Sequence, residues 1–574
     1  MPDEKGGEGP GQRGFHITAK HVILLLIIVG IIFRITSLAN RDVGFDANYY
    51  LTMGQSLVKH GEFYLPWGDV SNLNGAPQYS HHISPLFPAY LGMFYTLFGS
   101  TYFISQFASL LISLLGLAIV FWTTKDLYGV ERALVATAIF ALDFELIIET
   151  GKIYSENMTF LLFTLTMWAI IRGVKEDRYI ALAGLFAGLA YLVRSSLGYF
   201  FIIAGVGGFL WRFYYMRWGV FKNKWYMLAI AIFLAMVGGW GLRNLYRFGW
   251  PNWETSAVLQ STIANAFSQP FDYLLLVLLL VPYFVFIMLT YGAFWLPELK
   301  SSIRRIRDEQ TSGLWLAVFL VPFIALFVSG ALSLNETQKG VSLFWRDRVR
   351  YIFYAFLPLI WLGVRNVDFQ LERPLHGLFK GIAFQLSLLG ARIGEIVRNR
   401  PWLGAISLIL TGAALGFLAM GAWIAVFLLA AAFALCFRSP RKRLAIMLVV
   451  LLVFSVESGT AEVKFAAPRV GADVNGLLAP GEVVAVDGTT YHQFYFLYPF
   501  IVDAEDRIVS FQDNPGAQYL VSYNVTRDYT SLGFNETRCY YDVSAGGWIS
   551  EAAALMLGQT TKVSTLAIKL WKHL

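Results

Sequence analysis

Long apolar runs recur along this chain and constrain its fold more than any other feature. From Val22 to Val456 they repeatedly reach the length of about 20 residues that a helix needs to cross a hydrocarbon core of about 30 Å. Since 56% of the residues are hydrophobic and only 14% are charged, the composition argues against a soluble multidomain protein. The pattern predicts a polytopic helical membrane protein.

The apolar runs predict about thirteen membrane-spanning helices. We place them at residues 20–38, 102–122, 132–150, 155–172, 179–195, 197–212, 225–243, 272–296, 312–332, 348–364, 402–419, 421–437 and 443–456. With the N-terminus inside, the inner loops hold most of the Lys and Arg, as the positive-inside rule requires. The net charge of +7 is therefore an orientation signal, and no nucleic-acid partner is expected.

One further apolar segment, from Pro85 to Gly99, is not counted as a span. Counting it would turn Lys125 and Arg172 to the outer side, against the charge rule. We therefore expect this segment to be interfacial or re-entrant.

The spans divide the chain into regions. We predict a disordered cytoplasmic N-terminus at 1–19, a transmembrane domain at 20–364 with a large outer loop at 39–101, a cytoplasmic linker at 365–401, additional membrane helices at 402–456 and an extracytoplasmic domain at 457–574. The last region has the pattern of a small mixed α/β domain. Its predicted strands are "EVVAVDG", "RIVSF", "AQYLVSY" and "RCYYDVS", and its predicted helices are "TTYHQFYFLYPF" and a segment from about Ile549.

The predicted first outer loop carries an aspartate directly after the first membrane helix. In "GFDANYYLTM", Asp46 is followed by Tyr49 and Tyr50. Such an acid can simply be solvated, or can follow the end of the helix. Alternatively, an acid at the membrane edge is placed to remove a proton from a substrate hydroxyl. Residue chemistry alone leaves both interpretations open.

A second acidic group lies in "FALDFELIIETGKIYSENM". Acids inside a membrane span are costly and normally mark a polar pathway, which applies to Asp143 and Glu145. Glu145 and Glu149 are four residues apart and share one helix face. Glu149 and Glu156 could instead sit at the interface, and Glu156 also suits a helix N-terminus.

Isolated arginines fall on the predicted outer face. Arg194 ends one span, Arg243 and Arg247 are four residues apart in "GLRNLYRFGWP", and Arg350 lies in "FWRDRVRYIF". Arginines on the face that the charge rule depletes need an anion, and the planar guanidinium suits phosphate. The alternative is that some of them reach lipid headgroups.

Two adjacent histidines, His81 and His82, belong to the same first loop. Neighbouring side chains point in different directions and seldom bind one metal together, so a polar lip is the simpler interpretation. One of them, with an acid from another loop, could still hold a divalent metal ion.

In their order and placement these segments resemble the C-type (GT-C) integral-membrane glycosyltransferases that use polyprenyl-phosphate sugars. This is the class of the protein O-mannosyltransferases and the lipid A aminoarabinose transferases. The resemblance covers about Val22 to Val364. It rests on "DANYY", "HHISPLFPAYLGMFYTLFG", "IYSENMTFLLFTL", "YLVRS", "WGLRNLYRFGWP" and "RVRYIFYAFLPL".

The resemblance implies an all-α polytopic membrane protein with a GT-C-like helical bundle and an outward cavity, here followed by a small C-terminal α/β extramembrane domain. It implies that Asp46 acts at the acceptor and that Glu156 is the second catalytic acid. Arg194, Arg243 and Arg350 would contact the donor phosphate. The sequence has "DAN" where many members carry two adjacent acids, and it lacks "WWDYG", which argues against the oligosaccharyltransferase branch.

The activity implied is transfer of a sugar from a polyprenyl (dolichyl or undecaprenyl) phosphate to a hydroxyl of an extracytoplasmic glycan, lipid or protein. Inversion is expected for a single displacement. The partners would be the lipid-linked sugar, the bilayer and the acceptor, at the plasma membrane. The competing interpretation is a polytopic transporter or flippase of lipid-linked sugars, for which we find neither broken helices nor internal symmetry in the sequence.

Overall fold

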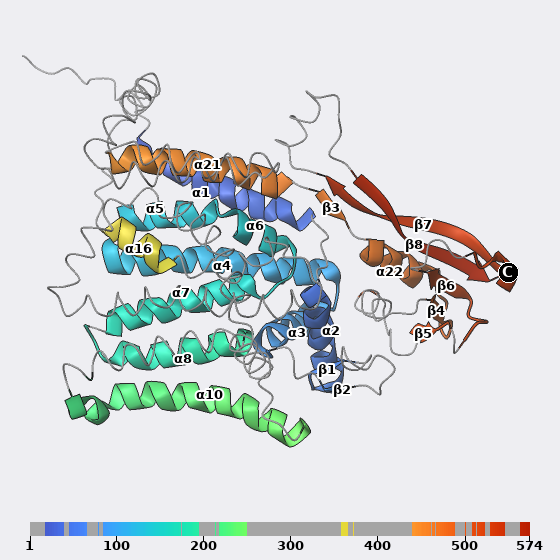
Figure 1. Cartoon of the computed structure of the whole chain (residues 1–574), viewed down its shortest axis with the longest axis horizontal. Helices are drawn as coiled ribbons and strands as arrows, with labels where there is room; N and C mark the ends of the chain where they lie inside the picture. The colour runs from blue at the N-terminus through green and yellow to red at the C-terminus, as the bar shows by residue number, and fades with distance from the viewer. Residues whose placement is uncertain are drawn as a thin grey trace, which may run out of the picture.

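A computed structural model gives the fold. It describes residues 18–39, 45–65, 78–79, 84–173, 175–194, 213, 217–248, 357–365, 371, 439–460, 462–464, 466–487, 500, 508–511, 514–522, 528–545 and 563–573. These residues form a bundle of long helices and a smaller domain built on a β-sheet (Figure 1). The predicted spans at 197–212, 272–296, 312–332, 402–419 and 421–437 lie outside the described residues.

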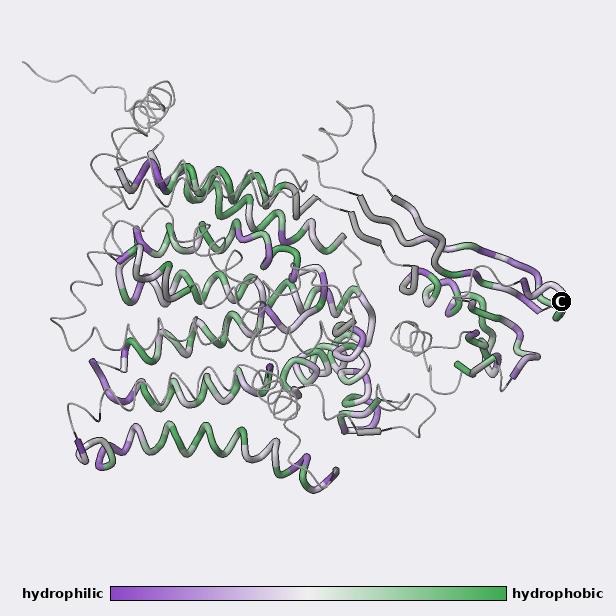
Figure 2. Tube along the Cα trace, in the orientation of Figure 1, coloured by the Kyte–Doolittle hydropathy of each residue, from purple (hydrophilic) through white to green (hydrophobic). Residues whose placement is uncertain are grey.

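The bundle helices pack side by side in the order α21, α1, α5, α4, α7, α8 and α10 (Figure 1). Figure 2 shows them apolar along their length and more hydrophilic towards their ends. In the described part of the chain α1, α4 and α10 are long and apolar enough to cross a membrane. The bounds are α1 Ala19–Thr36, α4 Tyr102–Tyr128, α5 Val130–Ala141, α7 Glu156–Gly173, α8 Arg178–Val193, α10 Lys224–Phe248, α16 Leu357–Arg365 and α21 Pro440–Thr460, with short 3₁₀ turns at Ser37–Ala39 and Arg217–Lys222.

Local signals explain where the helices begin and end. The hydroxyl of Thr101 accepts a hydrogen bond from the Ile104 N–H at 3.3 Å and caps α4, as threonine commonly does. Gly129, at φ 91°, separates α4 from α5 in a conformation that side chains disfavour. Six predicted spans correspond to helices, with most boundaries within a few residues: 20–38, 102–122, 155–172, 179–195, 225–243 and 443–456.

The two ends of the bundle differ in character. One end holds basic residues of the predicted inner loops: Lys125, Arg132, Arg172, Arg178 and Lys224. At the other end lie two shorter helices, α2 (Phe45–His60) and α3 (Leu86–Phe98), and beyond it the β-sheet (Figure 1). We call this second end the α2 end. The charge rule predicts that this is the outer end of the bundle.

The span predicted at 132–150 is not one helix, and this prediction was wrong. α5 ends at Ala141, and a separate helix α6 (Phe144–Gly151) follows. Asp143 is the N-cap of α6, because its carboxylate accepts the Leu146 N–H at 2.8 Å. The bundle therefore contains a helix break beside an acid for which the sequence suggested a different role.

The helix α3 lies against α2. At about 1.5 Å per residue its 13 residues span about 20 Å, too short to cross a membrane. A side chain at Gly54 would meet Tyr95 at 2.9 Å, so the glycine allows the two helices to approach closely. The rings of Tyr50 and Phe87 add an edge-to-face contact with centroids 5.0 Å apart. As expected, the segment 85–99 is not a span.

The C-terminal domain is built on a six-stranded sheet in the order β3-β7-β8-β6-β4-β5. β4 pairs in parallel with β5 and β6, and the other pairs are antiparallel. Val470 and Val474 of the helix α22 pack on one face, whereas Phe511, Tyr529 and Trp571 form the core of the other. The bounds are β3 Glu462–Lys464, α22 Ala466–Leu477, β4 Val484–Asp487, β5 Ile508–Ser510, β6 Tyr519–Ser522, β7 Phe534–Ala545 and β8 Val563–His573, with a 3₁₀ turn at Thr530–Leu532; a small hairpin of the first loop pairs β1 Tyr64–Leu65 with β2 Gln78–Tyr79.

The four strands predicted for this domain correspond to β4, β5, β6 and β7. The strands β3 and β8 and the helix α22 were not predicted. The two predicted helices, at 489–500 and from about Ile549, fall almost entirely outside the described residues, and the chain after them, at 563–573, is strand rather than helix.

One aromatic contact joins the C-terminal domain to the bundle. The ring of Phe500 lies 5.5 Å from that of Tyr102, at the start of α4. The Phe500 carbonyl accepts a hydrogen bond of 2.7 Å from the Asn475 amide of α22. Gly471 faces the same residue, because a Cβ there would lie 2.4 Å from the Phe500 Cβ. The domain thus contacts the bundle at the α2 end.

Candidate active site at the α2 end

The predicted second acid and one predicted arginine meet at the α2 end. Glu156 is the first residue of α7, and Arg194 is the C-cap of α8. The Arg194 Nη1 lies 2.6 Å from the Glu156 Oε1, and the exposed fraction of the two side chains is 14% and 2%. Neighbouring antiparallel helices thus bring an acid and a guanidinium, 38 residues apart, into a buried charge-assisted pair.

The first-loop helix docks beside this pair. The Tyr50 hydroxyl of α2 lies 3.0 Å from the hydroxyl of Ser155, the residue before Glu156. Tyr49 is also buried. Asp46 is the second residue of α2, one helical turn before Tyr50. The structure therefore places the helix that carries Asp46 against the turn that carries Glu156.

The far end of α2 contacts α10. Arg247 forms an ion pair with Glu62, which follows α2. The rings of Phe63 and Trp240 lie 5.9 Å apart, edge to face. Because Tyr50 reaches the start of α7, α2 and the turn after it bridge the ends of α7 and α10. Arg247, predicted to bind substrate, holds a protein carboxylate in this structure.

Arg243 lies one turn before Arg247 and has different neighbours. Its guanidinium lies 4.7 Å from the Trp240 ring, a cation–π contact. Its Nη1 donates a hydrogen bond of 2.9 Å to the Asn244 side chain. A guanidinium has five N–H donors, so this contact is compatible with a bound phosphate.

The acids of the α5–α6 break have partners other than Glu156 and Arg194 among the contacts described. Asp143 is fully buried and caps α6, and it also interacts electrostatically with Arg34 of α1. Glu145 and Glu149 are buried on α6, and the Lys152 Nζ lies 3.6 Å from a Glu149 oxygen. These contacts are with α1 and within α6, so the structure gives Asp143 a capping role that the sequence analysis did not foresee.

Three predicted site residues cannot be placed. His81, His82 and Arg350 lie outside the described residues. Within the described ranges, no group of three or more His, Cys, Asp or Glu side chains is arranged to hold a metal ion. The predicted metal site therefore stays a prediction.

The sequence analysis missed a set of buried polar residues behind Glu156. Arg34 is fully buried in α1, and it is the one charged residue in the apolar run "VILLLIIVGIIFRI". Ser113 of α4, Thr150 of α6 and Asn157 of α7 are buried as well. A single charge inside an apolar run was the available signal, because such a residue faces the protein interior.

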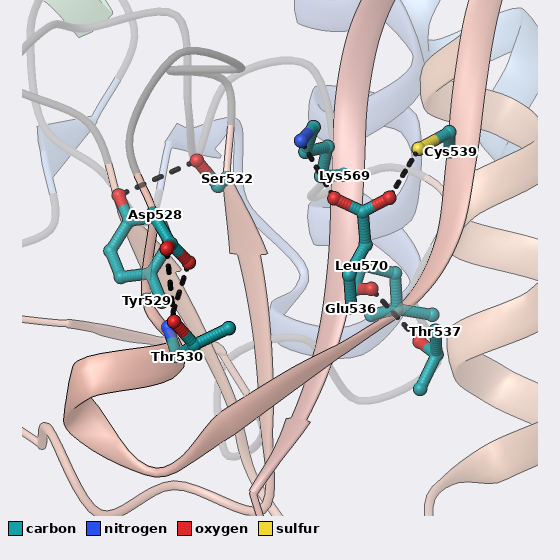
Figure 3. Close-up of polar contacts among 9 residues, drawn as sticks. All are labelled: Ser522, Asp528, Tyr529, Thr530, Glu536, Thr537, Cys539, Lys569 and Leu570. Atoms are coloured by element: carbon teal, nitrogen blue, oxygen red, sulfur yellow. Dashed lines mark hydrogen bonds and ion pairs between the residues drawn. The ribbon is translucent and has the colours of Figure 1, made fainter.

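A second polar cluster lies in the C-terminal sheet (Figure 3). Glu536 of β7 lies between Lys569, at 2.6 Å, and the Cys539 thiol, at 2.9 Å. The hydrogen bond from Cys539, with the Lys569 ammonium, lowers the pKa of Glu536. The same hydrogen bond raises the pKa of Cys539. The thiol is thus held in its protonated, less nucleophilic form.

The described part of the chain thus combines a bundle of apolar helices with a first-loop helix that contacts the residue before a buried acid–arginine pair. Residues 82–240 match the family model described as dolichyl-phosphate-mannose-protein mannosyltransferase. Among curated protein sequences no significant match was found.

Two crystal structures of ArnT from Cupriavidus metallidurans share the fold over nearly the whole chain. The apo structure gives a TM-score of 0.53 at 12% identity, covering 96% of this chain and 98% of that one. The structure bound to undecaprenyl phosphate gives 0.52 at 13% identity with the same coverage. At this identity the likeness shows the fold. With the family-model match it supports a GT-C glycosyltransferase family, in agreement with the sequence resemblance.

Proposed function

We propose that this chain is a membrane glycosyltransferase that moves a sugar from a polyprenyl phosphate to a hydroxyl of an extracytoplasmic acceptor. The observation that carries the proposal is the contact of α2, the helix of Asp46, through Tyr50 with Ser155, the residue before the buried acid of the Glu156–Arg194 pair. The family-model match to residues 82–240 supports the reaction class. The ArnT structure with undecaprenyl phosphate supports a polyprenyl phosphate as the donor lipid.

In the proposed reaction Asp46 is the general base. The acceptor oxygen attacks the anomeric carbon, its proton passes to the Asp46 carboxylate, and the bond between that carbon and the phosphate oxygen breaks. The electron pair of that bond leaves with the polyprenyl phosphate. A single displacement of this kind inverts the anomeric configuration.

The negative charge that develops on the leaving phosphate needs fixed positive charge nearby. Arg194 and Arg243, at the ends of neighbouring helices, are the proposed contacts, with Arg350 as a further one from the sequence. Glu156 keeps the Arg194 guanidinium in place through their 2.6 Å contact. Because Arg247 pairs with Glu62, we give it a role in holding α2 rather than phosphate.

The proposed orientation follows the charge rule. The N-terminus and the basic end of the bundle face the cytoplasm, and the α2 end and the C-terminal sheet face outward, in a plasma membrane. The acceptor then approaches Asp46 from outside, while the lipid tail of the donor lies between helices.

The break between α5 and α6 is the one observation that favours the transporter or flippase alternative. Interrupted membrane helices are a feature of transporters, in which they often surround the substrate. Here Arg34 and Asp143 satisfy the two new helix ends from within the protein, so the break also has a purely structural explanation.

The test is a transfer assay on the full chain in lipid nanodiscs. Donors are radiolabelled dolichyl and undecaprenyl phosphate sugars, and label released to water or to added acceptors is followed. Wild type is compared with Asp46→Asn and Arg243→Ala. The matched controls are Asp528→Asn, in the C-terminal domain, and Arg178→Ala, at the basic end.

We expect wild type and both controls to transfer the sugar. The transfer rate of Asp46→Asn and Arg243→Ala should be lower by about a hundredfold or more. Unchanged transfer by Asp46→Asn would remove the proposed base. If no donor is turned over while vesicle-reconstituted protein moves labelled lipid-linked sugar between leaflets, the flippase alternative replaces the transferase.

A further inference from the structure

The guanidinium of Arg34 closes the end of α5. It donates hydrogen bonds to the carbonyls of Phe140, at 2.7 Å, and Ala141. These carbonyls belong to the last turn of α5, and the Phe140 carbonyl also accepts the Asp143 N–H at 3.3 Å. Gly30, one turn before Arg34, allows the approach, because a Cβ there would lie 2.3 Å from the Ala141 oxygen. Arg34 therefore stabilises the break that precedes α6.

A chain of hydrogen bonds continues from Arg34 towards Glu156. The Arg34 Nε donates to the Ser113 hydroxyl of α4 at 3.1 Å. The Thr150 hydroxyl of α6 lies 2.9 Å from that of Ser113. The Asn157 amide of α7 donates to Thr150 at 3.3 Å. Four helices are thus joined through buried side chains, and the last residue of the series directly follows Glu156.

The turn between Thr150 and Glu156 is strained. Ile153 has φ 57°, in the left-handed region that a β-branched residue strongly disfavours, and it is fully buried. Such a conformation persists only where the surrounding structure determines it. The hydrogen bonds of Thr150 and Asn157 flank this turn on both sides, and the Tyr50–Ser155 contact lies within its last part.

We propose that Arg34, Ser113, Thr150 and Asn157 form a brace that positions Glu156 for its contact with Arg194. They are positioning residues, because none of them is placed to touch a substrate. The proposal rests on the proposed function for the role of Glu156 in the reaction. It goes beyond that function by assigning the orientation of the acid to a buried network on α1, α4, α6 and α7.

The brace also accounts for a buried charge that the reaction does not use. An arginine inside an apolar membrane helix costs free energy, and such residues normally have a functional or structural role in the protein interior. Through Ser113 and Thr150, Arg34 is linked to the turn that leads to Glu156. In this proposal the orientation of the acid depends on a residue of α1 that hydrogen-bonds the end of α5.

The first variant is Thr150→Val, which removes the hydroxyl and keeps the shape of the side chain. We expect kcat for transfer to fall about tenfold with KM unchanged within about twofold, because the acid is misplaced while the substrate contacts remain. Thr150→Ser restores the hydroxyl and should restore kcat. The matched control is Thr164→Val, since Thr164 is a buried threonine of α7 whose hydroxyl, among the described residues, donates to the Phe160 carbonyl of its own helix and to no other helix.

A double-mutant cycle separates positioning from general damage. If Thr150 acts through Glu156, adding Thr150→Val to Glu156→Gln causes no further loss of kcat. Should Glu156→Gln fall below detection, Arg194→Lys takes its place in the cycle. Fully additive losses would overturn the brace, as would an equal loss of kcat in Thr164→Val.

A second measurement does not depend on turnover. Hydrogen exchange of the amides in 151–156 is followed by mass spectrometry in nanodiscs for wild type, Thr150→Val and Thr164→Val. We expect exchange of this turn to rise about tenfold in Thr150→Val alone. Unchanged exchange would overturn the brace even if the chain is a transferase. Raised exchange without any transfer would support the brace and reject the proposed function.

Discussion

The α2 end of the bundle and the C-terminal sheet both hold acid–arginine pairs, but they hold them differently. Glu156 and Arg194 have exposed fractions of 2% and 14%. Asp473 of α22 and Arg538 of β7 have exposed fractions of 34% and 55%. Water can replace a lost partner in the sheet, whereas it cannot do so readily at the buried pair. We therefore expect loss of one partner to destabilise the fold much more at the buried pair than in the sheet.

The largest effect should follow from breaking the buried pair. Arg194→Ala leaves the Glu156 carboxylate buried without its guanidinium, which should cost about 3–5 kcal/mol of stability. We expect a large fall in the thermal midpoint in nanodiscs together with loss of transfer. In the double variant Glu156→Gln/Arg194→Ala, which removes both charges of the pair, part of the stability should return. A double variant as unstable as Arg194→Ala would contradict this account.

A smaller effect is expected from the close approach of α1 to α5. Gly30→Ala places a methyl group 2.3 Å from a backbone oxygen that cannot move alone, so we expect a loss of about 1–3 kcal/mol. Gly238→Ala of α10 is the matched control, because a Cβ there meets nothing within 4 Å. The control should be neutral or slightly stabilising, since alanine favours helix. Thermal unfolding of both variants distinguishes packing from helix propensity.

In the C-terminal sheet the polar contacts should tune reactivity rather than stability. The hydrogen bond to Glu536 raises the pKa of Cys539, so Glu536→Gln should lower that pKa and speed alkylation. At pH 8 we expect a rate increase between about twofold and tenfold. The measurement uses a Cys436→Ser background, so that a single thiol reacts. An unchanged rate would show that the hydrogen bond does not control the thiol.

The smallest effect concerns Asp473. Burial acts to raise its pKa, but hydrogen bonds from Tyr540 and Arg538 dominate and lower it. A carboxyl whose pKa is lowered on folding stabilises the fold above its unfolded value of about 3.9 and loses this contribution as the pH falls through the folded pKa. Asp473→Asn should therefore differ slightly from wild type in thermal midpoint at pH 7, and the difference should shrink towards pH 3. A difference that grows on acidification would mean that folding raises the pKa of Asp473 instead of lowering it.

Many helices of the bundle could be predicted because a membrane helix is determined by its own local sequence, an apolar run with basic residues at one end. The proximity of Glu156 and Arg194 could also be predicted, since both lie at the same end of two adjacent helices. The α5–α6 break could not, because "ALDFELIIETG" has no proline or glycine at the break and the interruption is stabilised by Arg34, more than 100 residues away. Strand β8 was missed because its pairing with β7 determines its structure.

The contact between Phe500 and Tyr102 restricts how the C-terminal domain can move relative to the bundle. The C-terminal sheet follows directly from α21, and it is also fastened to the start of α4 through this aromatic pair. A domain held at two points has less rotational freedom than a domain held at one point. The sheet is therefore held at two points near the α2 end of the bundle, by the chain from α21 and by the Phe500–Tyr102 contact.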